Sequence, residues 1–536
     1  MNFKLHKIIT IPKAYIIYYY YQFYRLSFNI TISKELSISK FKKNKPYILY
    51  DALFDNPLHW WKIVKFKNFY DKKYNSIGVI SSRNSFFSKI TVRVFKFNKI
   101  YKIIKKNTES IKIKKESLNI VSKINNKYDI INIKFPFNFP SYHLYDYILK
   151  KERLGTIDNK NYKILNQYIE ETLMYLYELN NFFLKYNIKH TVVSHKIGLQ
   201  ASALSWMSIY HKIPVRMINH YNGHTSILKL NNKDDFLSPI DDCFNKYEVS
   251  NLNEEYKKVL ENKGIEYLNK IRNGMEGEIQ RFKAYKIKSF FKKKDDFLKS
   301  FGIKSSEKKI VVIMANAWPD FPNQYGESIY PDFLEWFLST IEISKRNTNC
   351  IWLVKPHPAE SEYGDRVIIK NILNFNNYNN IFFWPKNANG KDLMKFCECV
   401  VSARGTSTIE YSALGKVALT CFDSPFSDFD FSYHGNTKET YENLLLNIHN
   451  LASPDENQKK IANIFASSYL ADLEIDGLPR FPFGDGSFRL FLKFNKYIKS
   501  NSQKLSNESA LMYDFLEDEK YKKYNVYRII KNLNNI

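Results

Sequence analysis

Residues 399–421 read CVVSARGTSTIEYSALGKVALTC. The apolar runs at the two ends, Cys399–Ser402 and Val417–Cys421, have the length of buried strands. Between them Gly405 marks a turn, and a helix is expected to begin near Ser407. A strand, a helix and a second strand in this order form a βαβ unit, which requires a parallel sheet with helices on its faces. This stretch therefore places the chain in the α/β class.

The same alternation continues on both sides of this unit. Further strands are predicted at 76–81, 128–133, 190–194, 214–218, 309–314, 350–354 and 381–384, and helices at 161–186, around 201–207 and at 332–344. We therefore predict two Rossmann-like, doubly wound domains that face each other across a cleft. In such sheets ligands bind beyond the carboxyl ends of the strands, so motifs at strand ends are the first candidates for a functional site.

Length and composition suggest where these domains divide. A chain of 536 residues is too long for a single core. The stretch from about 252 to 300 is charged and helical, which is typical of a connecting segment. We expect an N-terminal α/β domain, a linker or hinge, a C-terminal α/β domain and a helical basic tail, at residues 1–285, 286–305, 306–485 and 486–536 respectively.

Charge narrows the classes of partner. Lys and Arg total 81 against 54 Asp and Glu, a formal net charge of +27. Such a surplus favours polyanions or an anionic membrane surface. The sequence has no RNA-recognition signature, no zinc-finger spacing and no long basic run with interleaved glycine, so we do not expect nucleic acid to be the partner.

The N-terminus and the cysteines bear on location. Ala14–Phe28 reads AYIIYYYYQFYRLSF, which is apolar but shorter than the ~20 residues that cross a bilayer. A buried strand or helix is favoured there over an interfacial membrane anchor. The five cysteines are scattered, without metal-site spacing, which argues against a disulfide framework or a zinc site. We expect a protein of the cytoplasm, either soluble or peripheral at the inner face of the cell membrane.

The turn and helix within residues 402–410 carry one candidate site. A helix start offers unpaired backbone N–H groups and a positive dipole end, which suit a phosphate. Gly405 would let the ligand approach the backbone, and Ser402, Thr406 and Ser407 supply hydroxyl groups. Glu410 is placed to bond a ribose hydroxyl. The alternative is structural, because Ser407 and Glu410 also have the spacing of a capping box.

A second candidate follows the predicted strand at 350–354. The sequence Lys355-Pro-His-Pro358 sets a proline on each side of His357, which holds the loop extended and fixes where the imidazole points. His357 could donate to a phosphate or protonate it as it departs, and Lys355 could compensate its charge. A single histidine is more often structural, so this motif gains weight only in context.

Together these motifs resemble the capsule polysaccharide biosynthesis family. More broadly they are similar to the His-Pro-motif glycosyltransferases of the GT-B fold, which include bacterial Kdo transferases and sialyltransferases. The resemblance is specific over roughly 310–425, where Met314–Asp320 and Tyr330–Trp336 also fit, and weaker over 125–225, where Val193-Ser-His195, Gly198 and Ile213-Pro-Val215 fit.

The resemblance implies inverting, metal-independent transfer from a nucleotide-activated sugar, with a CMP-linked sugar as a candidate donor. It implies no cofactor, a donor side in the C-terminal domain and an acceptor side in the N-terminal domain. His357 would contact the donor phosphate, and Ser402, Thr406, Ser407 and Glu410 would hold the nucleotide. The acceptor would be a growing surface polysaccharide or a lipid-linked glycan.

Inversion also requires a general base on the acceptor side. The sequence lacks the acidic (D/E)DG triplet of the family, so the base is not assigned, and His195, His220 and Asp320 are candidates. Asn219–His224 contains two histidines, but Asn222-Gly223 predicts a turn there rather than a metal site, so we expect this segment to line the acceptor cleft.

Two other functions remain open from the sequence. One is a teichoic-acid-type glycerophosphotransferase, which would attack phosphorus instead of an anomeric carbon. The other is a non-catalytic basic protein that associates with a membrane or with nucleic acid.

Overall fold

The structure is a computed structural model of the chain. It describes residues 22–534 apart from 24–25, 28, 35, 37–40, 54–56, 82–85, 104–109, 159–163, 220–225, 240–241, 274–284, 286–290, 305, 359–367, 385–389, 471–499 and 501. His220, most of Ala14–Phe28 and parts of the expected linker and tail therefore lie outside the described residues.

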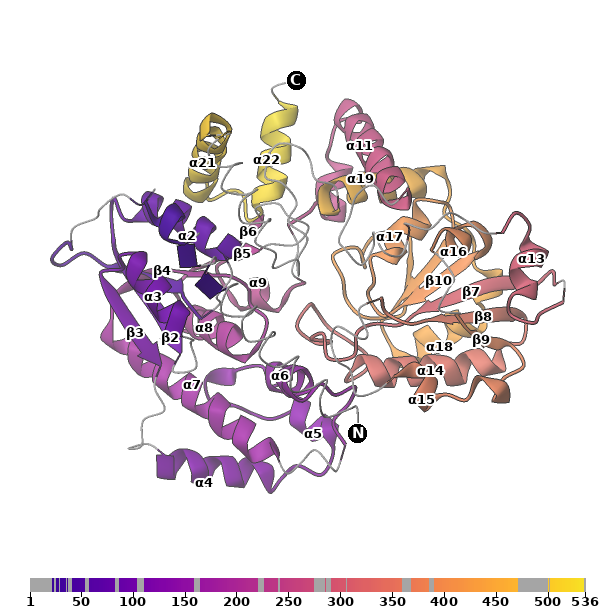
Figure 1. Ribbon diagram of the computed structural model, residues 1–536, viewed down its shortest axis with the longest axis horizontal. Helices are drawn as coiled ribbons and strands as arrows, with labels where there is room; N and C mark the ends of the chain where they lie inside the picture. The colour runs from indigo at the N-terminus through magenta and orange to yellow at the C-terminus, as the bar shows by residue number, and fades with distance from the viewer. Residues whose placement is uncertain are drawn as a thin grey trace, which may run out of the picture.

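Each half of the chain builds one six-stranded sheet (Figure 1). The first sheet has the order β3-β2-β1-β4-β5-β6, and only β6 is antiparallel to its neighbour. Its strands are β1 (Tyr47–Asp51), β2 (Asn75–Ser81), β3 (Lys99–Ile103), β4 (Ile188–Val193), β5 (Val215–Asn219) and β6 (Ser226–Leu230).

The second sheet repeats this arrangement with parallel neighbours throughout. Its order is β12-β11-β10-β7-β8-β9. Its strands are β7 (Lys309–Met314), β8 (Cys350–Lys355), β9 (Ile381–Phe383), β10 (Cys399–Ser402), β11 (Val417–Thr420) and β12 (Tyr433–His434). When the strands of the second sheet are counted from β7, both sheets have the strand order 3-2-1-4-5-6 of dinucleotide-binding folds. The expected fold class of two Rossmann-like domains is therefore confirmed.

Helices cover both faces of each sheet. Before β7 the chain forms α2 (Pro57–Tyr70), α3 (Phe86–Val94), α4 (Ser110–Val121), α5 (Lys127–Ile131), α6 (Tyr142–Glu152), α7 (Leu165–Lys185), α8 (Leu199–Tyr210), α9 (Lys233–Leu237), α10 (Lys246–Ser250), α11 (Glu254–Arg272) and α13 (Lys294–Lys299), with a short 3-10 turn η1 (Pro136–Asn138). After β7 it forms α14 (Phe333–Arg346), α15 (Ile369–Ile372), α16 (Gly390–Phe396), α17 (Ser407–Ser412), α18 (Lys438–Leu446), α19 (Glu456–Tyr469), α21 (Ser502–Glu517) and α22 (Tyr524–Leu533), with the 3-10 turns η4 (Phe375–Asn377) and η5 (Ile448–Asn450). Of these, α10 and α11 pack with the second sheet and α21 with the first.

The alternation of side chains along each strand explains this layering. Leu49 of β1 packs with helices α6, α7 and α8, whereas Ile48 and Tyr50 face a second cluster that includes α2 and α21. β7 shows the same alternation, because Val312 and Val311 point to opposite faces of the second sheet. Neighbouring residues of a strand face opposite sides of its sheet, so both faces of both sheets are buried.

Most of the strands and helices expected from the sequence are present, and one is wrong. Residues 128–133, expected as a strand, contain the helix α5 and its end. Asn126 accepts hydrogen bonds from the backbone N–H groups of Tyr128 and Asp129, and the side chain of Asp129 bonds back to Asn126. This reciprocal cap fixes a helix start that the apolar pattern of the segment does not reveal.

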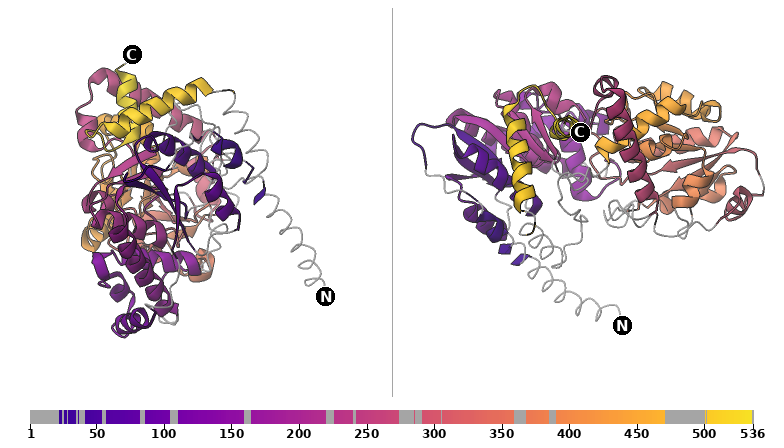
Figure 2. Two further views of the ribbon diagram at one scale, coloured as in Figure 1. Left: turned by 90° about the vertical axis from the view of Figure 1, so that its left-hand side faces the viewer. Right: turned by 90° about the horizontal axis from the view of Figure 1, so that it is seen from above.

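The chain passes between the two halves more than once. Residues 243–271, including α11, pack in one cluster with Ile310 and Val312 of the second sheet. The last helix, α22, packs Tyr524 and Tyr527 against the first half and Val526 and Ile529 against the second. Figure 2 shows α21 and α22 lying over the first half. The division into domains remains a proposal, and this packing favours an earlier crossing, near residue 242, than the expected hinge at 286–305.

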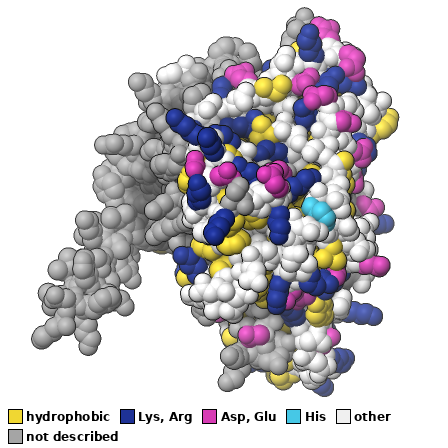
Figure 3. Space-filling view, turned by 90° about the vertical axis from the view of Figure 1, so that its right-hand side faces the viewer, with side chains coloured by type: hydrophobic (Ala, Val, Ile, Leu, Met, Phe, Trp, Pro, Cys, Tyr) yellow, Lys and Arg dark blue, Asp and Glu magenta, His cyan; other side chains and the backbone are white. Residues whose placement is uncertain are grey.

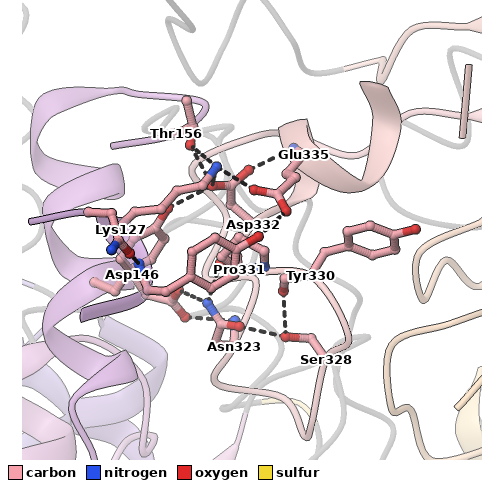
Figure 4. Close-up of polar contacts among 12 residues, drawn as sticks. Lys127, Asp146, Thr156, Asn323, Ser328, Tyr330, Pro331, Asp332 and Glu335 are labelled. Carbon is pink, nitrogen blue, oxygen red and sulfur yellow. Dashed lines mark hydrogen bonds and ion pairs between the residues drawn. The ribbon is translucent and has the colours of Figure 1, made fainter. Parts of the chain in front are cut away.

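A polar network joins the halves where the loop after β7 meets α5 and α6 (Figure 4). Buried Asp332 accepts hydrogen bonds from Tyr145 at 2.6 Å and Thr156 at 2.7 Å. Buried Asp146 accepts from the backbone and the side-chain amide of Asn323 at 2.9 and 2.8 Å. The network holds the loop between β7 and α14 against the first half. Within the described part of the chain, no helix has both the length and the apolar character needed to span a bilayer.

Candidate functional site

The two sequence motifs meet at the carboxyl edge of the second sheet. Strand register pairs Ser402 of β10 with Met314 of β7, and Met314 with Lys355 of β8. The ends of the three strands therefore form one row, although Lys355 and Ser402 are far apart in sequence. The row includes the boundary between β7 and β10, where the strand order reverses. In open α/β sheets this is the position at which ligands bind.

A charged cluster lies beside this row. Burial lowers the pKa of Lys355 to about 8, while the nearby Glu410 carboxylate acts in the opposite direction. Glu410 is itself buried, and its Oε2 accepts a hydrogen bond from the Tyr285 hydroxyl at 2.9 Å. Arg272 donates to the backbone oxygen of Glu410 at 3.3 Å. Two cations and one carboxylate thus converge on the end of the sheet.

The turn before α17 is tightly packed. The Ser402 hydroxyl accepts a hydrogen bond from the Gly405 N–H at 2.8 Å. A Cβ on Gly405 would lie 2.5 Å from Ser402 Oγ and 3.2 Å from Ser407 Oγ, so only glycine fits without displacing these hydroxyls. Ser402, Gly405 and Ser407 are therefore gathered within one turn at the edge of the sheet.

The capping box considered from the sequence is not formed. The helix begins at Ser407 with Thr406 as its N-cap, and Thr406 makes no capping side-chain hydrogen bond. The Glu410 carboxylate is instead engaged by Tyr285. The spacing of Ser407 and Glu410 therefore does not mark a capping box, and the Glu410 carboxylate is held by Tyr285 from another segment.

His357 and Arg404 lie in the loops that follow two of these strands. His357 is half-buried, two residues beyond the end of β8. The Arg404 guanidinium lies over the rings of Phe422 and Tyr325 and donates to the Pro322 backbone oxygen at 2.7 Å. Its Nε and Nη1 are buried with no hydrogen-bond partner among the described residues. Burial lowers the pKa of Arg404 to about 10.

A second site lies at the corresponding edge of the first sheet. Asp51 ends β1, and Ser194 directly follows β4, so they meet where this strand order also reverses. The Ser194 hydroxyl donates to Asp51 Oδ2 at 2.8 Å, and the Leu53 N–H donates to Oδ1 at 2.8 Å. A pocket of about 270 Å³ opens here, lined by Asp51, Leu53, Ser81, Tyr147, Lys151, His195, Ile197, Gly198, Leu199, Gln200 and Ala201.

His195 lines this pocket in a form suited to accept a proton. Burial lowers its pKa and His59 adds to the effect, while the Asp51 carboxylate opposes it. The Nε2 atom of His59 lies 2.9 Å from the backbone oxygen of Asp51. A lowered pKa keeps the His195 imidazole neutral near pH 7, which a general base requires.

The third candidate base, Asp320, occupies a different place. It lies in the loop after β7, where its carboxylate is 3.2 Å from the Lys150 ammonium of α6. The same loop reaches the pocket of the first sheet, because Gln324 Oε1 accepts a hydrogen bond from the Gly198 N–H at 2.7 Å. The second half of the chain therefore contributes to the surroundings of the first pocket.

The candidates predicted from the sequence thus fall into three places. Lys355, Ser402, Gly405 and Glu410 gather at the second sheet, His195 lines the pocket of the first, and Asp320 lies in the loop that joins the halves. Five residues of these two edges are not indicated by the sequence motifs: Asp51, His59, Arg272, Tyr285 and Arg404. Asp51 ends the apolar run Tyr47–Asp51, a strand signal that could have been found; Arg272 and Tyr285 carry no such signal.

Among the described residues, no group of three or more His, Cys, Asp or Glu side chains has the arrangement of a metal site. Lys355 and Arg272 each interact electrostatically with Glu410 at the edge of the second sheet.

Comparison with known proteins gives matches of fold only. No protein-family model and no curated protein sequence matches the chain. Among solved structures, KpsC from Thermosulfurimonas dismutans, a beta Kdo 2,4 transferase, is 11% identical with a TM-score of 0.29, over 52% of this chain and 79% of that one. The UDP-GlcNAc 2-epimerase from Neisseria meningitidis is 12% identical with a TM-score of 0.23, over 85% and 100%. The wall teichoic acid polymerase TagF is 10% identical with a TM-score of 0.21, over 94% and 99%. At these identities and TM-scores, the likenesses assign neither a substrate nor a reaction to this chain.

Proposed function

We propose that the protein is an inverting, metal-independent glycosyltransferase. It moves a sugar from a nucleotide-activated donor, for which a CMP-linked sugar is the first candidate, onto a growing surface polysaccharide or glycolipid. The motif resemblance over residues 310–425 supports the reaction class, and the positions of the charged side chains support the placement of the two substrates.

One observation carries this proposal. The row Ser402, Met314 and Lys355 lies at the switch point of the second sheet, with Glu410 beside it. A nucleotide needs cations for its phosphate and a carboxylate for its ribose hydroxyls, and Lys355 and Glu410 supply these two kinds of group together. In this proposal His357 contacts the departing phosphate, and Ser402, Gly405, Thr406 and Ser407 surround the nucleotide.

The acceptor is placed at the pocket of the first sheet. His195 takes the proton of the attacking hydroxyl, and Asp51 stabilises the imidazolium that forms, because an opposite charge nearby favours the charged form. We prefer His195 to Asp320 as the base, since Asp320 is held in an ion pair with Lys150. The acceptor side is then the N-terminal domain and the donor side the C-terminal domain.

A thermal-shift screen tests the donor half directly. The protein is mixed with CMP-, UDP- and GDP-sugars and with CDP-glycerol, and the expected result is stabilisation by one class of nucleotide-sugar. Stabilisation by CDP-glycerol alone would instead favour glycerophosphate transfer. No stabilisation by any of these, together with salt-sensitive binding of oligonucleotides, would favour the non-catalytic binding protein and contradict the proposal.

Inversion at the anomeric carbon is tested on the product of the reaction. With the stabilising donor and an oligosaccharide acceptor, NMR of the product is expected to show the anomeric configuration opposite to that of the donor. Retention of configuration would refute the inverting mechanism, and with it the need for His195 as a base.

A further inference from the structure

Helix α4 presents apolar and cationic side chains to solvent on a single face. Ile111 is 81% exposed and Leu118 is 60% exposed, and the exposed Lys114 and Lys115 lie between them. These positions are spaced by three, four and seven residues, so they form one stripe along the helix. We call Ile111, Lys114, Lys115 and Leu118 the α4 outer face.

The opposite side of α4 is the side that holds it to the molecule. Ile113 is buried in the core of the first half. The Ser117 hydroxyl donates to the Asn166 side chain at 2.5 Å, and Glu116 accepts from the Tyr177 hydroxyl at 2.8 Å. Glu116 is the only acidic residue of α4 and is engaged on this inner side. The α4 outer face therefore carries positive charge that no acidic residue of the helix offsets.

The place of α4 in the molecule leaves this face accessible. Figure 1 shows α4 at the lower extremity of the first half, with α7 above it, and it stays at the lower edge in the left view of Figure 2. The end of the molecule that carries the second sheet looks different. There, Figure 3 shows Lys and Arg interspersed with Asp and Glu. On that end of the molecule the basic side chains therefore have acidic neighbours, whereas the α4 outer face contains no acidic residue.

We propose that the α4 outer face docks on an anionic lipid surface. Single exposed apolar residues are ordinary, but two on one stripe with lysines between them match a helix that lies in the membrane interface. The apolar side chains would enter the boundary between headgroups and acyl chains, while the lysines would bind the headgroup phosphates. The net charge of +27 adds a long-range attraction to the same surface. This docking stands independently of the proposed transferase activity.

Flotation of the full chain with vesicles tests the proposal. Phosphatidylcholine vesicles with and without phosphatidylglycerol are compared, and the expected result is binding only when the anionic lipid is present. Lys114→Glu/Lys115→Glu is expected to weaken that binding by about tenfold or more. Ile111→Ser/Leu118→Ser is expected to weaken it by a similar factor, with a remainder that added salt removes.

Helix α11 offers matched controls, because Lys258 and Lys263 are exposed and Ile265 is 40% exposed. Lys258→Glu/Lys263→Glu and Ile265→Ser are expected to bind as the unaltered chain does. Thermal melts establish that each variant is folded. An equal loss in the α4 and α11 charge variants, or no loss in the α4 apolar variant, would overturn the proposal. So would an oligomer in solution that the α4 substitutions dissociate, since that result would assign the face to a contact between copies.

Discussion

Because burial lowers the pKa of Lys355, the charge of its side chain changes close to neutral pH. Burial lowers its pKa to about 8, so the ammonium loses its proton just above the neutral range. An anionic nucleotide is attracted only to the charged form. We predict that the affinity for the donor nucleotide falls by about tenfold or more as the pH rises through 8, because a charge-assisted hydrogen bond is lost. Isothermal titration across this range measures it.

Lys355→Met is the control, since it keeps the length of the side chain and removes the charge. It is expected to bind the nucleotide weakly at every pH, with the slope near pH 8 abolished. If the variant keeps that slope, another group is responsible for it.

The same shift predicts an effect on stability. A lysine whose folded pKa is depressed disfavours the folded state when it is charged; this cost is present below pH 8 and disappears as the pH rises past the ordinary lysine range. Lys355→Met is therefore expected to keep or raise the melting temperature at neutral pH while it weakens nucleotide binding. A lower melting temperature would show that Lys355 supports the fold.

Substitutions of His357 and Glu410 are expected to affect transfer activity and stability differently. We expect His357→Ala to reduce transfer by roughly 100-fold or more with little change in melting temperature, because the side chain is a half-buried loop residue. Glu410→Ala removes the acceptor that the Tyr285 hydroxyl uses and should also lower stability. Glu410→Gln keeps an acceptor there and is the better probe. Full transfer by His357→Ala would exclude it from the site.

At the residue scale, the sequence predicts those site residues that have a local signal, and the structure adds their distant partners. Lys355, Ser402, Gly405 and Glu410 could be proposed from the sequence, because strand ends and a glycine turn have local signals. Whether Ser407 and Glu410 form a capping box could not be decided from spacing, since it depends on Tyr285, which comes from a segment more than 100 residues away. Such long-range partners are set by packing alone.

At the scale of elements, the start of α14 is held by hydrogen bonds from both halves of the chain. Asp332 is its N-cap, accepting from the Glu335 N–H at 2.8 Å, and also accepts from Tyr145 and Thr156 of the first half. We predict that Asp332→Ala lowers the free energy of unfolding by about 3 kcal/mol, since a cap and two further hydrogen bonds are lost. Urea denaturation measures this.

Thr156→Val is the matched change, because it removes one of those hydrogen bonds and keeps the shape. It is expected to cost about 1 kcal/mol. Equal effects of the two substitutions would mean that the cap and the hydrogen bond from Tyr145 contribute nothing.

The elements themselves were largely predictable where an apolar run was bounded by a turn. β7 and β10 have the bounds expected from the sequence. The short apolar pattern of α5 fits a strand as well as a helix, so the expected strand is wrong there, and the cap at Asn126 is what makes the segment helical. β1 was not expected, although Tyr47–Asp51 is apolar and ends in a polar residue. Asp51, at the end of β1 and buried near His195, is therefore not predicted either.

At the scale of the whole molecule, polar contacts hold the halves together. Lys127 lies 2.5 Å from Glu335 Oε2, and Asn323 donates twice to the buried Asp146. Burial raises the pKa of Asp146 to about 7, so an Asp146 deprived of Asn323 gains by returning to water. We predict that Lys127→Ala/Asn323→Ala increases the radius of gyration in small-angle X-ray scattering. Lys246→Ala, which removes an exposed ion pair with Asp430, should not change it. An unchanged radius in the double variant would show that packing through α22 suffices.

The account depends most on the edge of the second sheet as a nucleotide site, and a structure of the complex with CMP tests it most directly. We expect the phosphate within hydrogen-bond distance of His357 or Lys355, and the ribose hydroxyls within reach of Glu410. A nucleotide bound at any other place, or an edge left empty at a saturating concentration of CMP and of the UDP and GDP nucleotides, would contradict the account.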